Sequence, residues 1–262
     1  MTDSEKRQIS SQKLIVEFLG TFALTYIGIW AVISFDQNVL TRNGVAMAHA
    51  ITLTVFMWFS YNISGAHFNS AITVGLLVVN KIDWTTALFY ILAQLLGAIV
   101  SSGFVFIQIS DQVLANIKDK SILGIPVPGS KNYEISGIWG EAIGTFFIMY
   151  VYVAMFQDNH RVKDKTIGSA AVGFIYYMCI ATLGEICGGG FNPARSLGPA
   201  IIEGSMEADL FVLAIGPIIG SILGAIIYSS VFIDMDEDLK EIEQERLERE
   251  KLENENREIE LH

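Results

Sequence analysis

Charged residues are scarce in this chain and are missing from long stretches of it. Only 17% of the 262 residues are Asp, Glu, Lys or Arg, whereas 52% are hydrophobic and the mean hydropathy is +0.44. A soluble domain of this length would need a charged surface, which this composition does not supply. Six stretches are apolar for about the length that crosses a bilayer. They are residues 14–34, 45–61, 84–107, 137–156, 167–186 and 209–232. The sequence therefore predicts a multi-pass membrane protein.

Other absences exclude further classes of protein. Residues 1–13 are polar and contain no apolar core with a cleavage site, so no signal peptide is predicted. No basic cluster suits nucleic acid, and most of the net charge of −11 comes from residues 233–262. The cysteines, Cys179 and Cys187, are too few and too close together to indicate a disulfide framework. No catalytic constellation, nucleotide loop or metal-ligand cluster appears, so we expect neither an enzyme nor a cofactor.

The predicted spans also suggest an orientation. Six spans place both termini on one side of the membrane, and most Lys and Arg outside the spans fall on that side. The exceptions are Arg42, Lys118, Lys120 and Lys131. The positive-inside rule therefore predicts cytoplasmic termini: a short N-terminal segment, 1–13, and an acidic helical tail, 233–262. A plasma membrane and a vacuolar-type membrane remain equal alternatives.

Two segments of the first half return in the second half. "SGAHFNSA" at 64–71 is echoed by "GGGFNPAR" at 188–195, and "EFLGTF" at Glu17 is echoed by "EAIGTF" at Glu141. Because both motifs recur in the same order, they indicate an internal duplication, with repeats at about 14–107 and 137–232. Because each repeat has three spans, the second copy must be inverted relative to the first.

Each Asn segment precedes an apolar run too short to cross the membrane, "AITVGLLVV" or "ARSLGPAII". Asn69 and Asn192 are good helix N-caps. Pro193 suits the first helical position after Asn192, and serine is acceptable at the corresponding position, Ser70. The runs therefore predict two half-helices that meet at the midplane. The backbone before each Asn is irregular, which at that depth is tolerated only inside protein or along a water-filled cavity. The residues expected to line a pore with their backbone are Gly65, Ala66, His67, Gly188 and Gly190.

Taken together, these motifs resemble the aquaporins, the major intrinsic protein family of water and small-solute channels. The resemblance covers residues 14–232 and rests on both Asn motifs and on the paired Glu-x-x-Gly-Thr-Phe openings; Ser70 departs from it, since the family usually has Pro there. It implies an all-α membrane protein with six transmembrane helices and two re-entrant half-helices. It also implies one pore per subunit and a homotetramer in membrane lipid, with water as permeant.

The resemblance also implies roles for single residues. Asn69 and Asn192 would orient single-file water, and the positive ends of two half-helices would repel cations and protons. Arg195 is a costly residue inside an apolar hairpin, and it corresponds to the arginine of the aromatic/arginine constriction. Glu17 and Glu141 would accept hydrogen bonds from loop N–H groups and support the half-helices, together with Ser70 and Pro193.

By spacing within the family pattern, the other three constriction residues are His49, Ile180 and Gly189. The set differs from the usual water-selective one and looks like that of some plant vacuolar-membrane (tonoplast) aquaporins, which are associated with water plus ammonia. Gly189 removes bulk, so the opening should be wider and partly apolar. Such a filter should admit ammonia, while Arg195 should reject ammonium.

Three alternatives stay open. One is a facilitator of small neutral solutes such as glycerol, urea or hydrogen peroxide, although Ser196 stands where glycerol-conducting relatives usually carry Asp. Another is a secondary transporter, which also uses inverted repeats and broken helices. The third is a membrane junction or scaffold protein that conducts poorly.

Overall fold

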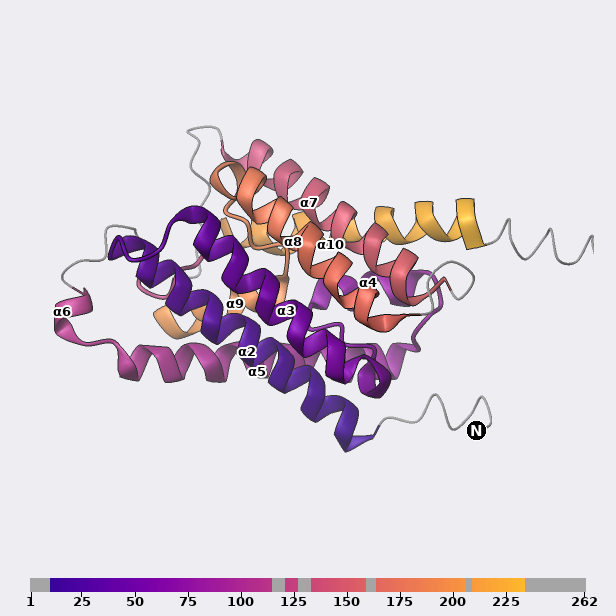
Figure 1. Cartoon of the computed structure of the whole chain (residues 1–262), viewed down its shortest axis with the longest axis horizontal. Helices are drawn as coiled ribbons and strands as arrows, with labels where there is room; N and C mark the ends of the chain where they lie inside the picture. The colour runs from indigo at the N-terminus through magenta and orange to yellow at the C-terminus, as the bar shows by residue number, and fades with distance from the viewer. Residues whose placement is uncertain (1–9, 115–120, 127–132, 159–163, 206–208, 234–262) are drawn as a thin grey trace, which may run out of the picture.

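The computed structural model describes residues 10–114, 121–126, 133–158, 164–205 and 209–233, and all regular secondary structure in these ranges is helical (Figure 1). Among the described residues, six helices are long and apolar enough to cross a membrane. They are α2 (Ser11–Asp36), α3 (Arg42–Ser64), α5 (Trp84–Gln108), α7 (Tyr133–Phe156), α8 (Lys165–Cys187) and α10 (Asp209–Tyr228), which continues as a π-helical turn, η1 (Ser229–Ile233). Each of the six predicted spans coincides with one of them. The predicted tail helix lies outside the described residues.

Capping residues explain why several helices begin at the start of their apolar stretches or up to three residues before it. Ser10, Thr41, Asp83 and Asp164 each accept a hydrogen bond from a backbone N–H in the first turn of α2, α3, α5 and α8. A side-chain acceptor satisfies a donor that the helix itself leaves unpaired. The polar caps therefore extend the spans toward the membrane surface. A short helix, α6 (Asp111–Leu114), was not expected from the sequence.

The two half-helices are present as α4 (Ser70–Val78) and α9 (Pro193–Glu203). At 1.5 Å per residue they are about 14–17 Å long, roughly half of the hydrocarbon thickness. Asn69 caps α4 through its side-chain oxygen, which accepts from Ala71 N–H, and Asn192 caps α9 in the same way. Each half-helix therefore starts in the middle of the protein rather than at its surface.

The packing of the helices has the symmetry of an inverted repeat. In the first half α2 packs on α5, and in the second half α7 packs on α10, while α3 and α8 join the halves. Each half-helix packs on a helix of the other half of the chain: α4 packs on α10, and α9 packs on α5. The start of α2 and the end of η1 lie at the same end of the molecule (Figure 1). Two three-helix units of opposite orientation explain this arrangement.

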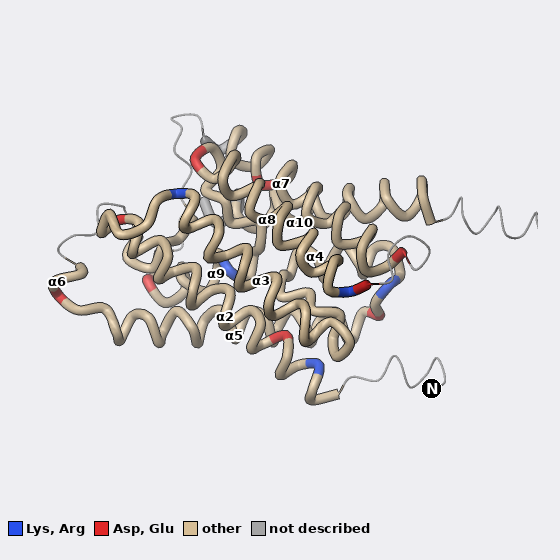
Figure 2. The backbone as a smooth tube through the Cα atoms, in the orientation of Figure 1, with Lys and Arg blue, Asp and Glu red and all other residues tan. Residues whose placement is uncertain are grey.

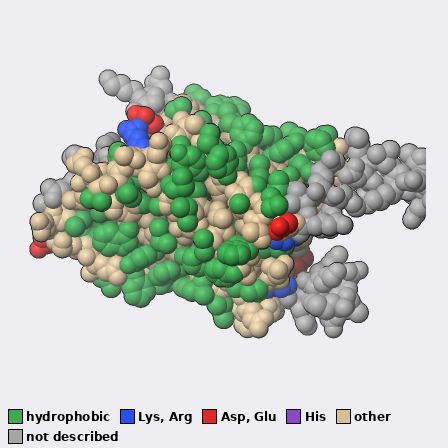
Figure 3. All heavy atoms as spheres, in the orientation of Figure 1, with side chains coloured by type: hydrophobic (Ala, Val, Ile, Leu, Met, Phe, Trp, Pro, Cys, Tyr) green, Lys and Arg blue, Asp and Glu red, His purple; other side chains and the backbone are tan. Residues whose placement is uncertain are grey.

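The surface suits a lipid environment. Large apolar side chains such as Trp58, Phe104 and Phe174 are exposed on the spanning helices. Figure 3 shows hydrophobic side chains spread over the visible face, and Figure 2 shows that most charged residues lie near the two ends of the helical body. An outer helix surface with this much exposed apolar area is stable only in a bilayer or against another subunit.

Close helix contacts in both halves depend on glycine. A Cβ added to Gly97 in α5 would lie 2.4 Å from the Phe18 carbonyl oxygen, and one added to Gly220 in α10 would lie 1.9 Å from that of Ala142. These two glycines are equivalent in the repeat. Small residues let helix backbones approach closely, and this packing stabilises helix pairs in membranes.

We therefore expect Gly97→Ala to push α5 away from α2 and to lower the free energy of unfolding by about 1–3 kcal/mol, as overpacking does in other cores. Thermal unfolding in detergent measures the effect. Gly103→Ala is the matched control, because it lies on the same helix and its added Cβ would have its nearest neighbour, Ile202 Cδ1, at 3.9 Å. Equal stability of the two variants would contradict the close contact at Gly97.

Candidate functional site: two asparagines at the meeting point of the half-helices

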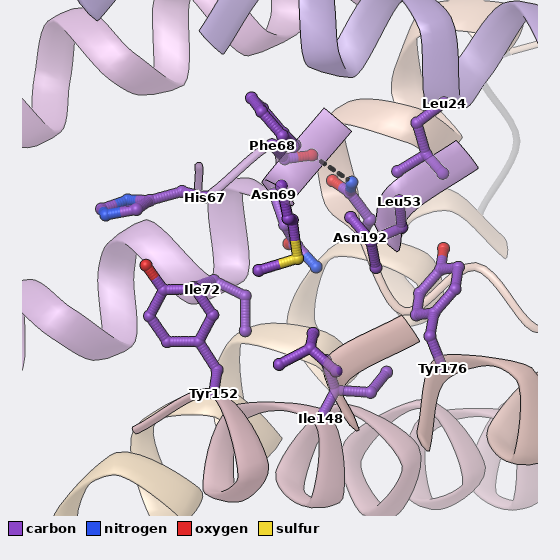
Figure 4. Close-up of a pocket in the computed structure, with 12 residues that line it drawn as sticks. Leu24, Leu53, His67, Phe68, Asn69, Ile72, Ile148, Tyr152, Tyr176 and Asn192 are labelled. Atoms are coloured by element: carbon purple, nitrogen blue, oxygen red, sulfur yellow. Dashed lines mark hydrogen bonds between the residues drawn. The ribbon is translucent and has the colours of Figure 1, made fainter. Parts of the chain in front are cut away.

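The side chains of Asn69 and Asn192 line the same small cavity, and each is hydrogen-bonded to the backbone of the opposite segment. Asn69 Nδ2 donates to the Phe191 carbonyl oxygen at 2.8 Å. Asn192 Nδ2 donates to the Phe68 carbonyl oxygen at 2.7 Å, a bond that Figure 4 shows as a dashed line. Because each Oδ1 accepts from the first turn of its own half-helix, the orientation of both amides is determined. An amide NH₂ group has two donors, so each asparagine retains a second N–H beyond these contacts.

Both half-helices direct their N-terminal ends at this point. The start of a helix carries a partial positive charge from its unpaired N–H groups and aligned peptide dipoles. Two such ends, together with two amide donors, present partial positive charge and N–H groups to any polar molecule that lies between them. In a protein interior this effect is stronger than in water, because little solvent screens it.

A small cavity adjoins the asparagines. Its volume is about 10 Å³, close to the room that one water molecule needs. Besides Asn69 and Asn192, its walls are mostly apolar or aromatic, and they consist of Leu24, Leu53, Met57, His67, Phe68, Ile72, Ile148, Tyr152, Val172 and Tyr176 (Figure 4). A polar molecule in this cavity has few hydrogen-bond partners other than the two amides.

A larger cavity of about 460 Å³ lies on the side where α2 begins. Lys13, Lys81 and Gln157 are among its lining residues. His67 lines this cavity and the small one, so it stands between them. Its Nδ1 is 3.0 Å from Thr73 Oγ1, and its ring packs edge-on against Tyr152. A wide entrance on the terminal side thus narrows at His67 before the asparagines.

On the other side of the asparagines, Arg195 contacts His49. Arg195 Nη2 lies 3.3 Å from His49 Nε2, and His49 Nδ1 lies 2.9 Å from the Val45 carbonyl oxygen. Because a carbonyl can only accept, Nδ1 carries the hydrogen and Nε2 accepts from the guanidinium. A Cβ added to Gly28 would lie 2.4 Å from His49 Nε2, so this glycine makes room for the ring.

The remaining two predicted constriction residues lie next to each other. Gly189 has a φ of +71°, and a Cβ added to it would lie 3.9 Å from Ile180 Cγ2. A residue with a side chain would be strained at this φ, so glycine suits both the backbone and the space. The structure thus brings His49 to Arg195 and Ile180 to Gly189.

A loop segment that the sequence did not point to also reaches Arg195. The Gly124 carbonyl oxygen lies 3.5 Å from Arg195 Nη1. The neighbouring Leu123 N–H and Ser121 Oγ donate to the carboxylate of Glu203 at the end of α9. The segment 121–126 therefore contacts α9 near the start of that helix, at Arg195, and at its end, at Glu203.

The two buried carboxylates hold the irregular segments before the half-helices. Glu17 accepts from the N–H groups of His67 and Phe68 at 2.9 and 2.8 Å. Glu141 accepts from those of Gly190 and Phe191 at 2.7 and 2.5 Å. A buried carboxylate with several donors stabilises backbone that has no helix or sheet of its own.

Backbone carbonyls in the same segments accept from tyrosines. Tyr152 Oη donates to the Gly65 carbonyl at 2.7 Å, and Tyr176 Oη donates to the Gly190 carbonyl at 3.3 Å. From the sequence, pore water was the expected partner of these carbonyls. A carbonyl oxygen has two lone pairs, so one position on each is taken by a hydroxyl.

Ser70, which departs from the expected Pro, has a partner of its own. Its Oγ donates to Gln94 Oε1 at 3.1 Å, and Gln94 Nε2 donates to Glu17 at 2.8 Å and to Thr73 Oγ1 at 3.0 Å. The serine therefore connects the first turn of α4 to the carboxylate that supports it. In the second half Pro193 has no side-chain donor for such a bond.

The same arrangement occurs in proteins of known family. The model of the family described as Major intrinsic protein matches residues 4–228. This chain belongs to the major intrinsic protein family. Members of this family are membrane channels for water and small solutes, so the protein is a multi-pass membrane channel and not an enzyme.

Among its relatives in this family, a probable aquaporin TIP2-1 of Oryza sativa subsp. japonica is 34% identical over 233 residues, covering 86% of this chain and 89% of the relative. Nodulin-26 of Glycine max is 31% identical over 225 residues, covering 84% and 78%. The X-ray structure of the aquaglyceroporin from Plasmodium falciparum has a TM-score of 0.77 at 25% identity and covers 86% of this chain and 97% of that one.

We expect Ser70→Ala to lower the free energy of unfolding by about 1–3 kcal/mol, because it leaves the buried Gln94 Oε1 without this donor. Thermal unfolding in detergent measures the change. Ser221→Ala is the matched control, since Ser221 Oγ is also buried and has no hydrogen-bond partner among the described residues. A loss at Ser221 as large as that at Ser70 would refute the role of the Gln94 bond.

Proposed function

We propose that this protein is a passive channel that conducts water and ammonia and excludes ions and protons. The observation that carries the proposal is the pair of asparagine amides at the meeting point of α4 and α9. Each amide has one N–H bonded to the opposite segment and one left over. A water molecule between them would direct its oxygen to both donors.

Such orientation explains the exclusion of protons. A water whose oxygen faces two fixed donors cannot at the same time accept a proton from the next water in line. The mostly apolar wall of the small cavity supplies few other partners that could rebuild the chain. The positive ends of both half-helices add a barrier to any cation, including H₃O⁺.

The contacts at the outer constriction support ammonia as a second permeant. Gly189 contributes no side chain and Ile180 is aliphatic, so this part of the proposed constriction is apolar and offers no side-chain hydrogen-bond donor. Arg195 keeps its positive charge there but directs one donor to His49. Neutral ammonia is smaller than most solutes and less strongly hydrated than ammonium, so the site should pass ammonia and repel ammonium.

Orientation and assembly complete the proposal. Lys13 and Lys81 line the wide entrance on the side where both described chain ends lie, which supports cytoplasmic termini by the positive-inside rule. The exposed apolar helix faces suit lipid and neighbouring copies of the chain. We therefore assign one pore to each subunit of a homotetramer.

We expect His49→Phe to reduce ammonia permeability about tenfold while water permeability changes less, since a phenyl ring adds bulk and removes the acceptor of Arg195. Proteoliposomes given an ammonia/ammonium pulse report ammonia entry as internal alkalinisation, and osmotic shrinkage reports water. Met47→Phe is the matched control, because Met47 is exposed on the same helix.

If wild-type vesicles alkalinise no faster than empty ones while they shrink rapidly, the protein is a water channel without ammonia conduction. If shrinkage is also no faster than in empty vesicles despite correct insertion, the proposal of a conducting channel fails.

A further inference from the structure

Tyr176 belongs to none of the sequence motifs, yet it lies between the constriction and the asparagines. It is one helical turn before Ile180 on α8, and its side chain is buried. Its ring centroid is 6.4 Å from that of His49 on one side and 6.3 Å from that of Phe191 on the other. It also lines the small cavity together with Asn69 and Asn192 (Figure 4).

The space beside Tyr176 is small, since the cavity that its side chain lines has a volume of about 10 Å³. At the proposed constriction Gly189 has no side chain. The Arg195 guanidinium contacts His49 Nε2 and the Gly124 carbonyl oxygen. One turn further in, the cavity has only about 10 Å³, bounded by Tyr176 on one wall and by Leu53 and Met57 among others. This is about the room of one water molecule.

The tyrosine ring is held in this position. Its hydroxyl donates to the Gly190 carbonyl at 3.3 Å, and Phe191 packs against it in a T-shaped arrangement. Turning the ring out of the way would leave a buried carbonyl without this donor and would break the aromatic contact, both of which are unfavourable. The ring is therefore a rigid part of the wall rather than a movable one.

The internal repeat makes the position informative. Tyr176 and Leu53 are 123 residues apart, as are Asn192 and Asn69, so they are equivalent positions of the two halves. Both line the cavity. The second half thus carries an aromatic ring where the first half carries an aliphatic side chain, and this narrows the path from one side.

We propose that Tyr176 is a specificity-determining residue, whose ring sets the upper size limit of the channel between the outer constriction and the asparagines. This inference rests on the proposed function. Water and ammonia pass beside the ring, whereas urea and three-carbon polyols such as glycerol are excluded there. Charge is then selected at Arg195 and size one turn further in.

The test compares permeability to water with permeability to urea and glycerol in proteoliposomes. Stopped-flow shrinkage measures water, and swelling in an inward gradient of urea or glycerol measures each solute. The variants are Tyr176→Val, which removes the ring, and Tyr176→Phe, which keeps the ring and removes the hydroxyl. Tyr177→Val is the matched control, because Tyr177 is the next residue on the helix, is half-buried and packs on Phe174 away from the cavity.

We expect wild-type vesicles to shrink fast and to take up glycerol and urea no faster than empty vesicles. Tyr176→Val should raise uptake of both solutes at least about tenfold, while Tyr176→Phe and Tyr177→Val should stay at the wild-type level. A purely structural role would lower thermal stability without changing the ratio of solute to water permeability. If Tyr176→Val does not assemble, Tyr176→Leu, which retains more volume, takes its place.

Two results would overturn the inference while leaving the channel intact. One is fast water permeability with background solute uptake in Tyr176→Val; the other is wild-type glycerol uptake as fast as that of Tyr176→Val. Wild-type water permeability at the level of empty vesicles, with the protein inserted, would instead remove the proposed function and the inference with it.

Discussion

The reciprocal hydrogen bonds between the two Asn segments are the interaction on which this architecture depends. They join Asn69 to the Phe191 carbonyl and Asn192 to the Phe68 carbonyl, so each half of the chain completes the other. At the middle of a bilayer no water reaches unpaired backbone from the lipid side, and each unpaired group is unfavourable by several kcal/mol. Two half-helices can therefore start there only if their loops are satisfied from within the protein.

Two buried carboxylates supply hydrogen-bond acceptors for the backbone N–H groups of these loops. Glu17 and Glu141 each accept two backbone N–H groups from the segment before a half-helix. Left alone, a charge in an apolar bundle would be strongly disfavoured, but several hydrogen bonds to it compensate for the lost water. The halves differ in detail, because Ser70 and Gln94 extend the contacts around Glu17. The departure from Pro at position 70 is thus accommodated by a polar contact.

Under the proposed function, polarity and size would be selected at different depths of the channel. Arg195 would place a positive charge at the proposed outer constriction, beside Gly189, which has no side chain, and the aliphatic Ile180. The asparagines would orient a polar molecule at the midplane, and the small cavity beside them would limit its size. Such a separation would let the constriction widen without opening the whole path.

Periodicity and repetition were sufficient to predict the six spans, the inverted repeat and both half-helices, because burial in lipid demands long apolar runs and Asn and Pro favour helix starts. The sequence also predicted Asn69 and Asn192 as the N-caps of the half-helices, which the structure confirms, whereas their role in a pore stays a prediction. The proximity of Tyr176 to both asparagines, the bond from Ser70 to Gln94 and the contact of Gly124 with Arg195 were decided only by tertiary structure. Each of these joins residues that no local pattern relates, since they meet through the packing of separate helices and loops.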